Sequence, residues 1–369
     1  MKNLTPIQSA VRVLQSVLLV VCGAINLGAV ADDQLALNVL ARVHFNTNVS
    51  NFEQAREFYG QLGFETVSGF PDTNTIEMAH AIGIKTPTSY DGSQGDAVGG
   101  YLLHGELIGL GLTGGIIDLI EFSIPRNDQP PYAAINHLGM VYAEMLTTDL
   151  DADYQHMTNL GVEFLSPPVR RANGTRFAMF KDPDGTFYEL QEIPSAGEDD
   201  REDRETTHID RLGAVAINVS DYEHSAAWYR LFGYELTQQL DQAESLEVGL
   251  AMGFAEPIKI IGGLFTHRQD GSQLKLMEWL SPRDDRPPYA LPINHLGIHR
   301  MAFSTSDIDA DVALLMQHGV TLVSPVTPCC SGPDSWGGII AFHDPDGTVM
   351  ELVEQPLMTF IAWLTSWFN

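Results

Sequence analysis

Two short motifs that carry ionisable side chains occur twice in this sequence. Ile-Asn-His-Leu-Gly contains His137 in its first copy and His295 in its second, and Asp-Pro-Asp-Gly-Thr begins at Asp182 and at Asp344. A histidine can transfer protons or bind a metal, and paired aspartates can bind cations. However, Asp-Pro-Asp-Gly is first of all a turn former, and a histidine that recurs with its neighbours can reflect a repeated loop packing. We interpret both motifs as structural, so a functional site is expected in the elements that they connect.

The repeat extends over most of the chain. The sequence at 48–51 returns at 218–221, that at 130–132 returns at 287–289, and that at 182–186 returns at 344–348. Internal similarity of this length indicates one ancestral unit that was duplicated. The chain therefore has two homologous halves.

Within each half the sequence indicates the order of strands and helices, and this order occurs twice. An alternating strand leads through a helix-capping residue, Asn51 or Asp221, into an amphipathic helix that ends at Gly63 or Gly233. Further strands, a second strand–helix pair and the Asp-Pro-Asp-Gly turn follow. The sequence predicts an α+β fold made of four βαβββ modules.

Composition and charge limit the class of protein. The chain has 369 residues, of which 44% are hydrophobic, and a formal charge of −28, which disfavours nucleic acid as a partner. Its cysteines, Cys22, Cys329 and Cys330, have no zinc-finger spacing, which excludes a zinc ribbon. Cys329 and Cys330 are expected as two reduced thiols, with a vicinal disulfide as the alternative.

The first 31 residues differ from the rest. Lys2 and Arg12 precede an apolar stretch, and Ala29-Val30-Ala31 supplies the small residues that a signal peptidase requires. We interpret residues 1–31 as a cleaved signal peptide and expect an exported, periplasmic protein. A retained membrane anchor is the alternative.

Two further segments lie outside the repeats. Residues 195–207 are rich in Glu, Asp and Arg and predict a charged linker. Residues 357–369 carry aromatic and aliphatic side chains at helical spacing and predict an apolar C-terminal helix. We expect this helix to pack against its own domain or against a second subunit in a homo-oligomer. Contact with a membrane is the less favoured alternative, because the segment is too short to span one.

The opening and the ending of each half resemble the vicinal-oxygen-chelate superfamily, which includes glyoxalase I, extradiol dioxygenases and bleomycin-resistance proteins. The resemblance rests on the helix motif Phe/Trp-Tyr-x-x-x-Gly and on Asp-Pro-Asp-Gly-Thr-x-x-Glu-Leu, and it covers nearly all of residues 40–355. It implies that the modules pair into two incomplete-barrel domains, at 38–194 and 208–356. A divalent metal would sit in the cleft on side chains from the first and last strands of each module.

In the first half, the resemblance assigns His44, Asp118 and Glu189 as metal ligands. An imidazole and two carboxylates can hold a divalent ion whose identity the sequence does not specify. Tyr142 stands where a second histidine is usual, and a neutral phenol is a weak ligand but a good hydrogen-bond donor. Glu189 would act as ligand or catalytic base, and Tyr142 as an electrophilic helper. His44 packed as a core histidine is the alternative.

In the second half, the corresponding positions are Ala214, Lys275, Arg300 and Glu351. No ordinary metal site is expected there. Lys275 and Arg300 are candidate substrate-binding residues for an anionic group. Alternatively, Glu351 forms a buried ion pair with these two cations.

These residues support three functional hypotheses. The first is a metal-dependent lyase, isomerase or epimerase of the glyoxalase type, acting on a small carbonyl compound through an enediolate. The second is an extradiol ring-cleaving dioxygenase, which needs two histidines and one carboxylate around iron. The third is a metal-free exported protein that binds a small anionic ligand. In all three the partner is a small molecule.

Overall fold

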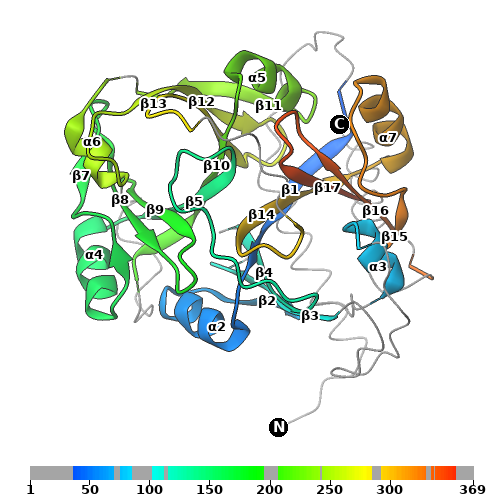
Figure 1. Ribbon diagram of the computed structural model, residues 1–369, viewed down its shortest axis with the longest axis horizontal. Coiled ribbons are helices and arrows are strands. Elements are labelled where there is room, and N and C mark those ends of the chain that lie inside the picture. The colour runs from blue at the N-terminus through cyan, green and yellow to red at the C-terminus, as the bar shows by residue number, and fades with distance from the viewer. Residues whose placement is uncertain are drawn as a thin grey trace, which may run out of the picture.

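The structure is a computed structural model, and it describes residues 36–69, 75–84, 102–111, 115–194, 207–241, 243–284, 292–329, 334–335 and 337–354. These form four modules, each with a strand, a helix and further strands (Figure 1). The predicted α+β class with four modules is confirmed. The elements of the first half are β1 (Val39–Asn48), α2 (Phe52–Gln61), β2 (Glu65–Gly69), α3 (Ile76–Ala81), β3 (Leu102–Gly109), β4 (Ile116–Ile124), β5 (Gly139–Thr147), α4 (Leu150–Asn159), β6 (Glu163–Phe164), β7 (Val169–Arg170), β8 (Arg176–Lys181) and β9 (Phe187–Glu192). Those of the second half are β10 (Ile209–Asn218), α5 (Tyr222–Arg230), β11 (Tyr234–Gln239), α6 (Leu246–Ala251), β12 (Lys259–His267), β13 (Gln273–Ser281), β14 (Gly297–Thr305), α7 (Ile308–Gln317), β15 (Thr327–Cys329), β16 (Gly337–His343) and β17 (Val349–Glu354).

The first helix of each half starts and stops for the reasons read from its sequence. The side chain of Asn51 accepts a hydrogen bond from the backbone N–H of Gln54, and Asp221 caps α5 in the same way. Gly63 follows α2 with a φ of 96°, a left-handed conformation that glycine adopts without strain. The predicted helix boundaries are therefore confirmed at both ends.

The strands form two curled sheets, and each sheet takes one module from each half. Sheet A has the order β15-β16-β17-β14-β1-β4-β3-β2, and sheet B has the order β11-β12-β13-β10-β5-β9-β8-β6, with β7 paired to β8. In Figure 1, β14 to β17 lie on the right and β5 with β8 to β10 on the left. At the centre of each sheet two first strands run antiparallel, β1 with β14 and β10 with β5. Two half-barrels are thus present, as predicted.

We expected the two modules of one half to close one half-barrel, and in this respect the prediction was wrong. The first module pairs with the fourth and the second with the third. Charge balance gives a physical reason for this choice. It places Arg300 of β14 next to Asp118 of β4, and Lys275 of β13 next to Glu189 of β9. Pairing within the halves would instead bury Lys275 and Arg300 together, with too few carboxylates to neutralise them.

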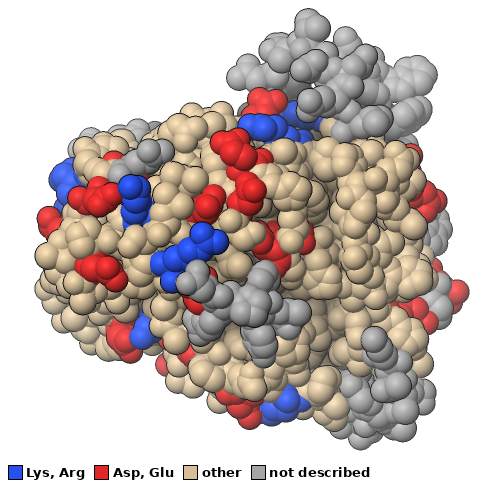
Figure 2. All heavy atoms as spheres, turned by 45° about the horizontal axis from the view of Figure 1, so that its top comes forward, with Lys and Arg blue, Asp and Glu red and all other residues tan. Residues whose placement is uncertain are grey.

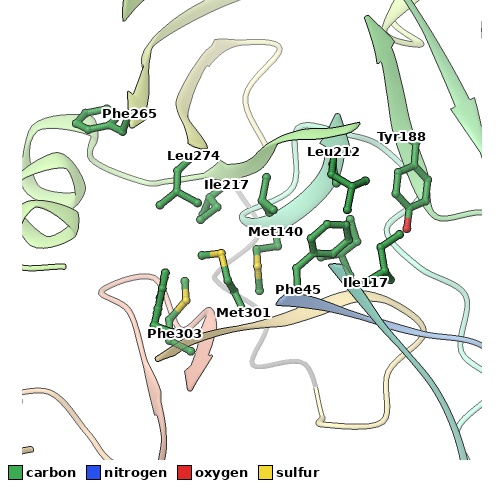
Figure 3. Close-up of a cluster of buried hydrophobic side chains, with 14 of the residues drawn as sticks. Phe45, Ile117, Met140, Tyr188, Leu212, Ile217, Phe265, Leu274, Met301 and Phe303 are labelled. Atoms are coloured by element: carbon green, nitrogen blue, oxygen red, sulfur yellow. The ribbon is translucent and has the colours of Figure 1, made fainter. Parts of the chain in front are cut away.

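The largest hydrophobic core lies between the two sheets and contains side chains from both. Phe45 and Met301 of sheet A meet Met140 and Ile217 of sheet B (Figure 3). Side chains alternate along a strand, so each sheet has a second face directed away from this core. Smaller hydrophobic clusters occupy these second faces, which we call the concave faces of sheets A and B. Any site on the concave face of sheet A is therefore separated from one on sheet B by the shared core.

The Asp-Pro-Asp-Gly turns connect the sheets across this core. Asp182 accepts hydrogen bonds from the backbone N–H groups of Asp184 (3.0 Å) and Thr186 (2.8 Å) and from the Tyr59 hydroxyl (3.0 Å). Asp344 accepts from the Tyr229 hydroxyl at 2.9 Å in the same arrangement. The interpretation of these aspartates as turn formers is confirmed. Because Tyr59 lies on the helix after β1 while Asp182 precedes β9, the bond joins the sheets.

Acidic and basic side chains both occur on the face of the protein shown in Figure 2, with several acidic groups near its centre. None of the helices in the described ranges combines the length and apolar character needed to cross a bilayer.

Several predicted segments lie outside the described residues. These are the signal peptide at 1–31, the linker up to residue 206 and the apolar helix at 357–369. Cys329 is described and is disulfide-bonded, so the expectation of a reduced thiol there was wrong. Cys330 lies outside the described residues.

Candidate functional site

The concave face of sheet B carries a buried network of two carboxylates and two cations. Glu144 of β5 and Glu189 of β9 are neighbours across a parallel strand pair. Lys275 of β13 contacts Glu144 and lies 3.4 Å from Glu189. Arg171, in the loop after β7, binds both oxygens of Glu189 at 2.8 and 3.0 Å. The four charges sum to zero.

The network shifts the pKa values of Glu189 and Lys275. Burial alone would raise the pKa of Glu189, but Arg171 and Lys275 outweigh it and lower that pKa to about 2. Burial lowers the pKa of Lys275, yet the two carboxylates outweigh it and hold that pKa above its usual value. Both groups are therefore charged at neutral pH, and each is neutralised by its neighbours.

Arg171 and Tyr142 border the network. The Arg171 guanidinium lies 3.6 Å from the centre of the Phe177 ring, so it is held by a cation–π contact as well as by Glu189. Burial raises the pKa of Tyr142, which keeps the phenol neutral. Its hydroxyl donates only a weak bond, to the Met277 sulfur at 3.7 Å. Tyr142 therefore has hydrogen-bonding capacity left for another group.

A cavity of about 170 Å³ opens above this network. One wall is apolar and includes Val248 and Met252, at and just beyond α6, and Ile260 of β12. Of the four charged groups, Glu144, Arg171 and Lys275 line the cavity and Glu189 does not, and Asp241 is the other charged residue of the described lining. The uncharged polar lining consists of Tyr142, Asn173, Thr175, Gln191, Gln238, Ser245 and Gln273.

The concave face of sheet A carries a second charged cluster. His44 of β1, Asp118 of β4, Arg300 of β14 and Glu351 of β17 converge there. Arg300 lies 3.5 Å from Asp118 through Nη2 and 2.9 Å from Glu351 through Nε. The predicted ion pair between Glu351 and Arg300 is thus confirmed, whereas Lys275 belongs to the other sheet.

This second cluster has unused polar atoms. His44 Nδ1 is 3.9 Å from Asp118, too far for a hydrogen bond, and it has no partner within the described part of the chain. The same holds for Asp118 Oδ1 and Arg300 Nη1. Burial and Arg300 lower the pKa of His44 to about 3. Burial raises the pKa of Asp118 to about 7, with Arg300 opposing and Glu351 adding to the rise.

The structure does not bring together the trio predicted to bind a metal. His44 and Asp118 lie in sheet A, whereas Glu189 and Tyr142 lie in sheet B, on the far side of the shared core. Lys275 and Arg300, predicted to act together on an anion, are also divided between the sheets. The cause is the pairing of modules across the halves. The individual positions do point into concave faces, as the resemblance implied.

Two residues of the sheet B network were missed from the sequence. Glu144 could have been found, because it lies two residues after Tyr142 and shares its strand face. Arg171 lies in a loop and carried no sequence signal. The repeated histidines are held by local packing: the rings of His137 and His295 each donate a hydrogen bond through Nδ1 to the next backbone carbonyl, at 2.9 and 2.8 Å.

The residues present do not fit a divalent metal in either cluster. In sheet B the ammonium of Lys275 already lies between the two carboxylates. In sheet A the guanidinium of Arg300 contacts both acids. A dication about 4 Å from such a cation would be repelled by about 8 kcal/mol at an effective dielectric constant of about 20. Within the described residues, no three or more His, Cys, Asp and Glu side chains are grouped to hold a metal.

Comparisons with known proteins agree with this architecture. The sequence model of the Glyoxalase/Bleomycin resistance protein/Dioxygenase superfamily matches residues 41–190 and 211–352. Glyoxalase I from Zea mays is similar in structure, with a TM-score of 0.55, 15% identity and coverage of 88% of this chain and 94% of that one. A candidate dioxygenase from Bacillus subtilis has a TM-score of 0.54, 14% identity and 87% coverage of both chains. No curated protein matches the chain in sequence. At these identities the structural likeness shows the fold alone.

Proposed function

Because the chain belongs to the glyoxalase/bleomycin resistance protein/dioxygenase superfamily, whose fold presents a ligand cleft, we propose that it binds a small organic molecule in the cavity of sheet B. The resemblance predicted from the sequence is confirmed, but membership alone does not define an activity. The observation that carries the proposal is the cavity of about 170 Å³ above a floor whose charges cancel.

Size and charge define the ligand class. A cavity of about 150 Å³ is known to accept benzene, so this one suits a single ring with a small substituent. The Lys275 and Arg171 charges are already used by Glu144 and Glu189. An anionic ligand would therefore have no free cation to pair with among the described residues that line the cavity, and burying its charge unpaired would be unfavourable. We propose an uncharged ligand, in place of the anionic one inferred from sequence.

The lining suggests how such a ligand would lie. Its apolar body would pack against Val248, Met252 and Ile260, and its polar group would face the Tyr142 hydroxyl and the amides of Gln191 and Gln273. Such a division between an apolar wall and a few polar groups is typical of small-molecule sites. A glyoxalase-type lyase or an extradiol dioxygenase would need a metal on residues that lie here in two separate sheets, so we rank ligand binding first.

The test compares three probes that share one ring and differ in charge. Benzyl alcohol, benzoate and benzylamine are titrated into the full chain by calorimetry. We expect benzyl alcohol to bind at least about tenfold more tightly than either charged probe, which corresponds to about 1.4 kcal/mol. A preference for benzoate would refute the assigned ligand class.

Two substitutions on one helix locate the binding. Val248 on α6 lines the cavity, whereas Leu250 on the same helix is 52% exposed. Val248→Trp should fill the cavity and abolish binding, and Leu250→Trp should leave it unchanged. Circular dichroism confirms that both variants fold. Binding that survives in Val248→Trp would place the ligand elsewhere.

A further inference from the structure

The sheet A cluster contains the types of side chain that bind metals, although in their present arrangement around Arg300 they are not grouped to hold an ion. His44, Asp118 and Glu351 supply an imidazole and two carboxylates, from the first strand of one module and the last strands of two. The fourth position, on β14, is Arg300. The set therefore contains three side chains of the kinds that bind divalent transition metals, and one permanent cation.

Arg300 occupies the place between the two acids. Its Nη2 lies 3.5 Å from Asp118 and its Nε lies 2.9 Å from Glu351. Residue 300 is only 5% exposed, so this positive charge cannot move into solvent without rearrangement. The guanidinium thus contacts both carboxylates that a divalent ion would otherwise hold and offsets part of their charge.

The remaining ligand atoms are nevertheless unused. His44 Nδ1 and Asp118 Oδ1 are buried and have no hydrogen-bond partner within the described residues. Buried polar atoms normally find partners. The guanidinium therefore contacts only some of the atoms in this cluster that could bind a metal ion.

We propose that Arg300 takes the place of a divalent ion in sheet A, and that this one side chain prevents His44, Asp118 and Glu351 from binding such an ion. The inference concerns a different site from the ligand cavity of sheet B and goes beyond the proposed function. It makes a gain-of-binding prediction. Exchanging the guanidinium for a neutral imidazole removes the repelling charge and adds a fourth ligand.

The experiment measures Co²⁺ and Zn²⁺ binding to chelator-treated full chain by calorimetry, with the visible absorption spectrum of Co²⁺ as a report on its ligands. We expect no stoichiometric ion on the wild-type protein. Arg300→His should bind one ion at least about a hundredfold more tightly, a factor comparable to the upper effect of one group that supports a metal ligand. Added Co²⁺ should also raise the melting temperature of this variant alone.

Two controls locate the ion. Adding His44→Ala to Arg300→His should abolish the new binding. Lys275→His in sheet B should create no comparable site, because Arg171 still holds both oxygens of Glu189. If Arg300→His does not fold, Arg300→Gln removes the same charge and should still bind an ion through three ligands.

Each outcome decides the proposal. One ion on the wild-type protein that His44→Ala removes would overturn it, because Arg300 would then not exclude metal. Folded Arg300→His and Arg300→Gln that both bind no ion would also overturn it, because the excluding group would then not be Arg300.

Discussion

The sheet B network makes a quantitative prediction for Lys275→Met. Methionine has nearly the length of lysine and no charge, so the substitution removes the ammonium without opening a large cavity. Glu189 keeps both bonds from Arg171, whereas Glu144 keeps only the backbone N–H of Ala214 at 3.0 Å. The main effect is therefore one buried carboxylate, 3% exposed, without a cation.

Leaving one partner of a buried ion pair uncompensated costs about 3–5 kcal/mol. Since domains are stable by only about 5–15 kcal/mol, this loss would be a large fraction of the total. Removing the second charge as well should restore most of it. We therefore expect Glu144→Gln combined with Lys275→Met to recover at least about 2 kcal/mol relative to Lys275→Met, because a pair without charges can be nearly neutral in energy.

Equilibrium urea unfolding, followed by fluorescence and circular dichroism, measures these differences. Lys259→Met is the matched control, because Lys259 lies 3.3 Å from Glu244 on the surface, with both side chains more than half exposed. Exposed pairs contribute about 0–1 kcal/mol. A cost for Lys275→Met no larger than that of Lys259→Met would refute the assignment of a buried, mutually dependent network.

Two further predictions concern the turns that join the sheets. Burial raises the pKa of Asp182 from 3.8 to about 7, with its hydrogen bonds opposing the rise, so the native state keeps this proton where the unfolded chain loses it. The stability contribution of this proton is full below about pH 4 and is lost as pH rises through about 7. The free energy of unfolding should therefore fall more between about pH 5 and pH 8 for the wild-type protein than for Asp182→Asn. Equal pH dependence of the two proteins in urea unfolding would contradict this. Tyr229→Phe removes the donor to Asp344 and should lower the free energy of unfolding by about 1.5–3 kcal/mol in the same assay; a change below about 0.5 kcal/mol would mean that the bond contributes little.

The elements could be predicted from sequence because their signals are local. Asn51 and Asp221 cap their helices, and the Asp182 and Asp344 turns form as read, because each depends on residues only a few positions apart. The number and order of the modules follow from the repeat in the same way.

The pairing of the modules could not be read from local signals. All four modules have an equivalent first strand, and any two such strands could pair side by side. What distinguishes the alternatives is long-range charge, since Arg300 needs Asp118 and Glu351 while Lys275 needs Glu144 and Glu189. The candidate positions were therefore identified individually, but they were combined into the wrong site.

The unit that was duplicated is one half of the chain, whereas each half-barrel is built from one module of each half. Each copy of the ancestral segment contributes one wall to both half-barrels. Recombination that replaced one copy would therefore alter the ligand cavity of sheet B and the Arg300 cluster of sheet A in the same event. By contrast, replacing the continuous stretch 139–281, which carries every strand of sheet B, would change the cavity without changing a side chain of the Arg300 cluster.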